Sequence, residues 1–123
     1  MQQYSVACGT GQVTFTLPPG MRADIVEPRR GTPVDLVQAT EAALREPVAG
    51  PSLAELAKPG QKVCIVFTDA TREVPDHVLV PALLRELHAA GVRREDVTLL
   101  CGVGMHRPST HEEKVAKLGA DVV

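Results

Sequence analysis

The spacing of hydrophobic and polar residues changes character along the chain. Residues 4–8 and 12–17 are short runs rich in β-branched and aromatic side chains, and the Gly-Thr-Gly segment at residues 9–11 predicts a hairpin turn between them. A third short strand is expected at residues 23–26. Apolar residues then recur at helical spacing over residues 33–47, which predicts an α-helix bounded by proline at both ends.

Two continuous apolar runs, residues 62–67 and 97–101, are typical of strands buried on both faces of a sheet. A helix is expected between them, with Asp76 as its N-cap and Gly91 as its C-terminal stop. Strands joined by a helix in this order pair in parallel through a crossover. The expected fold class is therefore α/β: an N-terminal β-hairpin region followed by Rossmann-like βαβ units with a parallel sheet.

Two further helices are predicted from their start signals. Ser52 and Glu55 have the spacing of a capping box, in which each residue bonds the backbone N–H of the other. Ser109 and Glu112 have the same spacing, and the helix that they open is expected to end at Leu118. Both helices therefore begin with a residue pair that satisfies free backbone donors.

The last residues, 120–123, have the composition of a strand that is just beginning. An apolar strand left unpaired invites aggregation, so we expect the chain to be a truncated part of a larger protein. Within it, residues 1–60 are expected to form the hairpin and a helical lead-in. Residues 61–123 are expected to form the βαβ core, which carries the site loops.

Composition excludes several function classes. The chain has 44% hydrophobic and 23% charged residues with a net charge of −2, which is ordinary for a globular protein. It has no cluster of Lys and Arg, and its aromatic residues are one Tyr and two Phe. A nucleic-acid surface needs a basic stripe, and single-strand binding needs aromatic platforms. Nucleic acid is therefore not an expected partner.

The cysteines and the N-terminus indicate a location. Cys8, Cys64 and Cys101 are far apart and form no C-x-x-C pair, and the last two lie inside apolar runs. This pattern favours reduced core thiols over a disulfide or a zinc site. The N-terminus has no signal-peptide pattern, and no apolar run reaches the length of a membrane span. We therefore expect a cytoplasmic protein without membrane partners.

Residues suited to an anionic ligand follow both predicted strands of the core. In open parallel sheets, ligands bind beyond the carboxyl ends of the strands. The loops at residues 68–75 and 102–108 occupy that position and carry Arg72 and Arg107, which can each fork onto a carboxylate or phosphate. His106 is the side chain in these loops that is suited to proton transfer near neutral pH.

Three further residues of these loops are candidates for contacting a ligand. Asp69 could orient Arg72 or accept from a hydroxyl, Thr71 adds a hydroxyl and a backbone N–H, and Gly104 lets the backbone approach a ligand closely. Each has a plainer explanation. Asp69 and Arg72 could form a loop salt bridge, His106 could be an exposed loop histidine, and two glycines spaced by one residue are a weak phosphate signal.

Two segments resemble a known family. Residues 67–75 resemble its D-x-T-R-x-x-P segment, and residues 104–113 closely resemble its G-x-H-R-P-S-T-H-E-E segment. The family is that of nickel-dependent lactate racemase and related 2-hydroxyacid racemases and epimerases. The resemblance covers most of residues 62–123, whereas the opening third carries no motif.

The resemblance implies a cofactor and residue roles. These enzymes use a nickel-pincer nucleotide, bound between two domains, that takes hydride from C2 of a 2-hydroxyacid while a histidine removes the hydroxyl proton. His106 matches a catalytic histidine, Arg72 matches an arginine that holds the substrate carboxylate, and Asp69 matches a carboxylate near the cofactor. Arg107 is a second candidate for the substrate, and Thr71 and Gly104 are candidates for the cofactor.

The chain also departs from the family. Family members are several-fold longer, and their cofactor-attachment lysine, second catalytic histidine and nickel-ligating histidine lie beyond the matched region. No metal ligand is therefore assigned here. We expect the chain alone to bind nickel poorly and to be inactive, and its partners to be a small 2-hydroxyacid and the missing C-terminal portion of the same protein.

Two other functions remain open from the sequence. The chain could be a stand-alone module that binds a nucleotide phosphate or a carboxylate without catalysis, in which case binding depends on Arg72. It could also be a structural domain, in which case Arg72→Ala changes only local stability.

Overall fold

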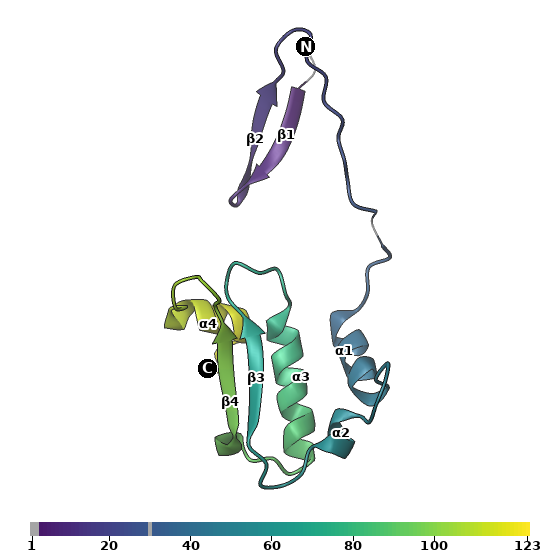
Figure 1. Cartoon of the computed structure of the whole chain (residues 1–123), viewed down its shortest axis with the longest axis vertical. Coiled ribbons are helices and arrows are strands. Elements are labelled where there is room, and N and C mark those ends of the chain that lie inside the picture. The colour runs from purple at the N-terminus through teal and green to yellow at the C-terminus, as the bar shows by residue number, and fades with distance from the viewer. Residues whose placement is uncertain (1–2, 30) are drawn as a thin grey trace. The chain divides into compact units, whose positions relative to one another are not determined.

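A computed structural model describes residues 3–29 and 31–123 of the chain. They are mixed α and β, and they belong to two units, Met1–Thr32 and Pro33–Val123 (Figure 1). The second unit holds both predicted site loops. The expected division at residue 60 concerns the larger protein and stays a prediction. No helix in the described part of the chain has the length and apolar character needed to cross a membrane.

The first unit contains the predicted hairpin. Strands β1 (Gln3–Cys8) and β2 (Gly11–Thr16) pair antiparallel through a two-residue turn, and the rings of Tyr4 and Phe15 stack across them at 5.9 Å. The predicted third strand at residues 23–26 is wrong. A strand needs a partner for its backbone groups, and no described residue pairs with this segment, whose Val26 is 91% exposed.

The second unit is a two-stranded parallel sheet with helices. Its elements are α1 (Leu36–Arg45), α2 (Leu53–Leu56), β3 (Val63–Thr68), α3 (Asp76–Ala89), a 3₁₀ turn (Arg94–Asp96), β4 (Val97–Gly102) and α4 (His111–Leu118). The crossover helix α3 lies along β3, and α1 packs on the other side of α3 (Figure 1). In the β3–β4 register, Val63 pairs with Val97 and Thr68 pairs with Gly102, so both strands end together.

The core lies between one face of this sheet and the helices. Ile65 and Phe67 of β3 pack with Val80 and Leu87 of α3, and further buried members are Val92 and Leu118. Burying apolar surface stabilises a fold by about 25 cal/mol per Å², so this cluster is the main source of stability. Because the inward positions alternate along β3, the residues between them point to the other side of the sheet.

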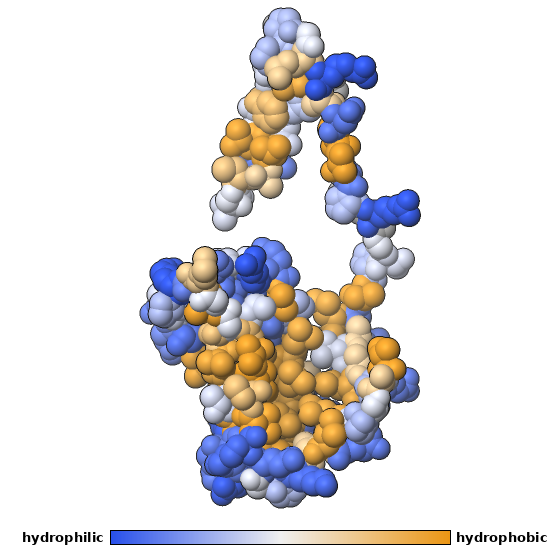
Figure 2. Space-filling model, in the orientation of Figure 1, coloured by the Kyte–Doolittle hydropathy of each residue, from blue (hydrophilic) through white to orange (hydrophobic). Residues whose placement is uncertain are grey.

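That other face is open, so the prediction of strands buried on both faces is wrong for the described residues. Cys64, Val66 and Leu100 are exposed, and apolar surface gathers over β3 and β4 between polar ends (Figure 2). Cys64 is thus not a core thiol, whereas Cys101 is half-buried. An unbroken apolar run favours burial on both faces, but each face is buried only where another element covers it.

The two faces of β3 predict a sharp contrast between neighbouring substitutions. Phe67 is 4% exposed and Val66 is 64% exposed. Phe67→Ala should lower the free energy of unfolding by about 3–5 kcal/mol, whereas Val66→Ala should change it by less than about 0.5 kcal/mol. Urea unfolding of the 123-residue chain measures both variants. Equal losses would show that the outer face is covered in solution.

The helix ends differ from the sequence predictions in informative ways. Asp76 is the first residue of α3 and not its N-cap, because its carboxylate instead accepts from the backbone N–H and hydroxyl of Thr68 at 3.3 and 2.6 Å. The capping box of α4 is shifted by one residue, to Thr110 and Glu113. His111 consequently occupies the first position of α4.

Three other element ends test the sequence predictions. The capping box of Ser52 and Glu55 is present as predicted. Gly91 also ends α3 as predicted, and its φ of +87° and a Pro59 Cγ only 2.8 Å from the place of a Cβ leave room for glycine alone. Residues 120–123 form a turn and not the predicted strand, with Val122 packed against the core.

Candidate functional site

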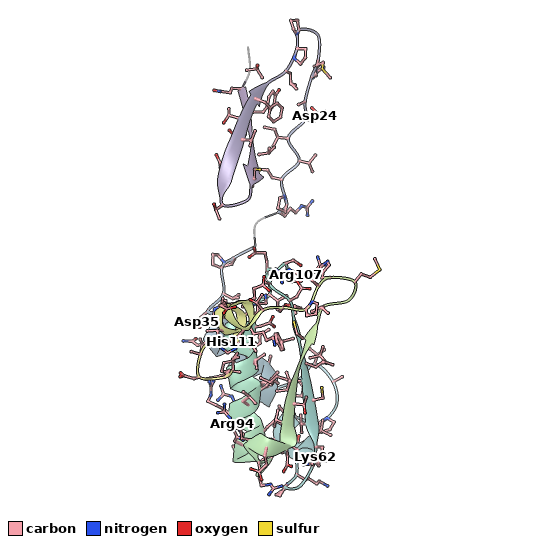
Figure 3. The ribbon with its side chains drawn as sticks, turned by 90° about the vertical axis from the view of Figure 1, so that its left-hand side faces the viewer. Asp24, Asp35, Lys62, Arg94, Arg107 and His111 are labelled. Carbon is pink, nitrogen blue, oxygen red and sulfur yellow. The ribbon has the colours of Figure 1, made fainter. Side chains whose placement is uncertain are left out.

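The two predicted site loops meet at one edge of the sheet. The β3–α3 loop follows Thr68 and the β4–α4 loop follows Gly102, and these two residues are register partners. Arg107 lies at this end of the second unit, and Lys62 lies at the opposite end (Figure 3). The prediction that both loops follow the carboxyl ends of paired parallel strands is confirmed.

Asp69 and His106 join the two loops. The Nδ1 atom of His106 lies 3.0 Å from Oδ2 of Asp69, across 37 residues of sequence. The other carboxylate oxygen, Oδ1, accepts from the backbone N–H and hydroxyl of Thr71 at 2.8 and 2.6 Å. Asp69 is only 5% exposed, so these bonds replace the water that a carboxylate otherwise needs.

These hydrogen bonds fix the charge of the carboxylate. The hydroxyl and N–H of Thr71, followed by His106, hold the pKa of Asp69 far below its usual range. An ionised carboxylate accepts hydrogen bonds only. Nδ1 of His106 must therefore carry the proton in this contact, and in the neutral imidazole Nε2 is free to accept one. Since the side chain is 44% exposed, Nε2 can act as a general base towards a bound ligand.

Arg107 is engaged by Glu113 of α4. Its two terminal nitrogens donate to the two carboxylate oxygens at 2.9 and 2.6 Å, in the fork geometry typical of arginine. Arg107, with the backbone N–H of Thr110, lowers the pKa of Glu113 to about 2. The predicted role of Arg107 in substrate binding, which stays a prediction, therefore requires that a ligand compete with Glu113.

Arg72 has a fixed backbone and an exposed side chain. Its N–H donates to the carbonyl of Asp69 at 3.1 Å, and its own carbonyl accepts from Lys117 of α4. Within the described part of the chain its guanidinium forms no ion pair, and Asp69 is bonded to Thr71 and His106 instead. The loop salt bridge between Asp69 and Arg72 is therefore not the arrangement observed.

The remaining candidates border open space. Gly104 has a φ of +57° and no heavy atom within 4 Å of the place of a Cβ, so its backbone is accessible. A pocket of about 90 Å³ is lined by Asp69, Ala70, Thr71, Arg107, Ser109 and Glu113. Because a water molecule takes about 30 Å³ of the liquid, this pocket has room for a small group and not for a whole nucleotide.

Two site residues escaped the sequence analysis. Glu113 fell inside the matched motif but was not assigned a partner, although its position three residues after Thr110 is a capping signal. Lys117 lies in the last turn of α4, where a basic residue ordinarily complements the helix dipole. Nothing in its spacing indicates that it reaches a loop 43 to 45 residues earlier in the chain.

Comparisons with known proteins identify the family of the chain. A family model described as the lactate racemase N-terminal domain matches residues 8–123. The chain belongs to this family. Lactate racemase of Lactiplantibacillus plantarum is 40% identical over 86 residues, which are 70% of this chain and 20% of that protein.

A second lactate racemase matches the whole chain. The enzyme of Thermoanaerobacterium thermosaccharolyticum is 29% identical over 126 residues, covering 100% of this chain and 29% of its own length. The solved structure of the lactate racemase apoprotein from that organism has a TM-score of 0.72 at 27% identity, over 99% of this chain and 28% of its own. The chain thus spans under a third of the length of the relatives that it matches.

Proposed function

We propose that this chain is part of the N-terminal domain of a two-domain 2-hydroxyacid racemase or epimerase of the lactate type, in which His106 transfers the hydroxyl proton of the substrate. The observation that carries the proposal is the hydrogen bond between Asp69 and His106 at 3.0 Å. It leaves Nε2 of an accessible imidazole as a proton acceptor, at the strand ends where ligands of parallel sheets bind. Membership of the lactate racemase family supports the reaction type.

The surrounding residues fit a 2-hydroxyacid. The exposed guanidinium of Arg72 can bind the carboxylate in a forked contact, which presents the neighbouring hydroxyl to His106. Nε2 then takes the hydroxyl proton as C2 loses hydride, and a 2-keto acid forms. Return of the hydride to the opposite face of C2, with a proton delivered to the carbonyl oxygen, inverts C2, so a second acid–base group outside this chain belongs to the proposal.

The nickel-pincer nucleotide fits these residues in part. The open backbone at Gly104 leaves room for a phosphate, whereas the N–H and hydroxyl of Thr71 already donate to Asp69. When bound, the group supplies the acceptor for the hydride from C2. Among residues 3–29 and 31–123, no three His, Cys, Asp or Glu side chains are grouped so as to hold a metal ion. The proposal therefore draws the nickel ligand and the attachment lysine from the remainder of a longer, cytoplasmic protein.

The test is a racemisation assay on the natural gene product, purified with its cofactor. Incubation with single enantiomers of lactate and of larger 2-hydroxyacids, followed by chiral chromatography, should show one acid converging on an equal mixture. The 123-residue chain alone should convert none of them. Binding of a carboxylate or phosphate without conversion by the natural product would instead establish the binding module.

A further inference from the structure

Lys117 of α4 reaches out of its helix into the β3–α3 loop. Its ammonium donates to the carbonyl of Arg72 and, at 2.9 Å, to that of Val74, and it lies 3.4 Å from Oδ2 of Asp76. The side chain is only 12% exposed. An ammonium has three donors; two hydrogen bonds go to these carbonyls, and the charge forms an ion pair with Asp76. Lys117 is thus committed to the protein and not to a ligand.

Asp76 extends the contact to the sheet. Its nearly buried carboxylate accepts from the backbone N–H and hydroxyl of Thr68, the last residue of β3. Lys117 and Asp76 together therefore connect the end of β3, the start of α3 and the last turn of α4 with the loop between them. We call this group the lysine clamp.

The loop is held on both sides of Arg72. Upstream, Asp69 is fixed by Thr71 and His106, and its carbonyl accepts the N–H of Arg72. Downstream, the lysine clamp holds the carbonyls of Arg72 and Val74. The backbone of Arg72 is thereby bonded at both its N–H and its carbonyl, whereas its side chain is exposed. A fixed backbone under an exposed guanidinium keeps the entropy cost of capturing an anion small.

We propose that Lys117 is a positioning residue that sets Arg72 for the substrate carboxylate. The inference rests on the proposed function and adds to it a residue that lies outside the two loops. The charge of Lys117 is matched by Asp76, so Arg72 presents the uncompensated cation to the ligand. Loss of the clamp frees the loop and leaves the Asp76 carboxylate without its partner, and both changes weaken the binding of an anion.

The experiment uses the natural gene product with its cofactor and compares Lys117→Met with Lys117→Arg. Lys114→Met is the matched control, because Lys114 lies on the same helix and forms no side-chain hydrogen bond within the described residues. Arg72 acts through binding, so Lys117→Met should raise KM for the 2-hydroxyacid roughly tenfold and change kcat by less than about twofold. Lys117→Arg should restore most of the affinity, and Lys114→Met should leave KM unchanged.

A second readout does not depend on activity. Hydrogen exchange of the amides at residues 69–74 should be roughly tenfold faster in Lys117→Met than in the parent protein, and near the parent rate in Lys117→Arg. Should Lys117→Met fail to fold, Asp76→Asn removes the ion pair but can still accept from Thr68, and a smaller change in the same direction is expected from it.

The outcomes separate the two proposals. A folded Lys117→Met protein with unchanged KM and unchanged exchange overturns the clamp. If Lys117→Met lowers only the amount of active protein and leaves KM unchanged, the positioning role of Lys117 is also overturned, because that result is expected of a lysine that only stabilises the fold. If the parent protein racemises no 2-hydroxyacid, the proposed function fails, and the exchange rates still decide whether Lys117 fixes the loop.

Discussion

Replacing His106 with glutamine is expected to lower kcat for racemisation by roughly 10²- to 10⁴-fold, the usual contribution of a positioned general base. Glutamine keeps a polar side chain that can donate to Asp69, so the loop retains its contact at the end of β4. It has no nitrogen that can accept the substrate proton. Initial rates in both directions, measured by chiral chromatography on cofactor-loaded protein, give the loss.

His88 supplies the matched control. It is an exposed histidine in the last turn of α3, and its Nδ1 is also engaged, by the carbonyl of Val92 at 2.9 Å. Glutamine at this position should leave kcat within about twofold of the parent, because surface changes away from the site are nearly neutral. A His106→Gln protein that keeps its cofactor and retains near-parent activity would remove His106 from the mechanism.

The position of the two site loops could be predicted from the sequence, because each loop follows the carboxyl end of a strand. Two apolar runs joined by a helix pair in parallel, and parallel pairing brings their carboxyl ends to one edge. Thr68 and Gly102 are register partners, so the loops that follow them, which carry Asp69 and His106, lie together. Local patterns sufficed here, because the apolar runs end at residues 67 and 101, one residue before the strands end at Thr68 and Gly102.

The partners of individual polar groups could not be predicted in the same way. Asp76 has the sequence signature of an N-cap, but its carboxylate satisfies Thr68, which only the fold brings near. Ser109 stands where a capping residue would, yet it lies against the sulfur of Cys101 at 3.5 Å, and Thr110 caps α4 instead. The sequence shows which hydrogen-bond donors and acceptors are present, whereas the tertiary structure determines which of them form a bond.

The prediction that the outer face of the sheet is buried was wrong for a related reason. Val66 and Leu100 belong to runs whose composition is typical of a fully covered strand, but a strand's own sequence does not contain its cover. The predictions of strands at residues 23–26 and 120–123 are wrong for a similar reason, since neither segment pairs with any described residue. The hydrophobic pattern shows that a segment favours a strand, but the strand forms only where another strand pairs with it.

Asp69→Asn is expected to lower kcat by about 10²-fold or more without unfolding the loop, by reversing the tautomer of His106. The asparagine carbonyl can still accept from the N–H and hydroxyl of Thr71, as Oδ1 does now. Its amide nitrogen then faces Nδ1 of His106 and donates to it. The ring proton moves to Nε2, which can no longer accept the substrate proton. Nitrogen-15 chemical shifts of the His106 ring should show the exchange directly.

Asp96 is the control for the loss of a buried carboxylate. It is buried like Asp69 and bonded to Arg93 and Lys62 at the amino end of the strands, so Asp96→Asn should cost stability but not kcat. The cofactor content of Asp69→Asn separates two roles. If Asp69 contacts the cofactor, as its motif implies, the variant loses bound nucleotide and keeps its rate per loaded site. If Asp69 orients His106, the loading persists and the rate per loaded site falls, because an imidazole with its proton on Nε2 cannot be the base.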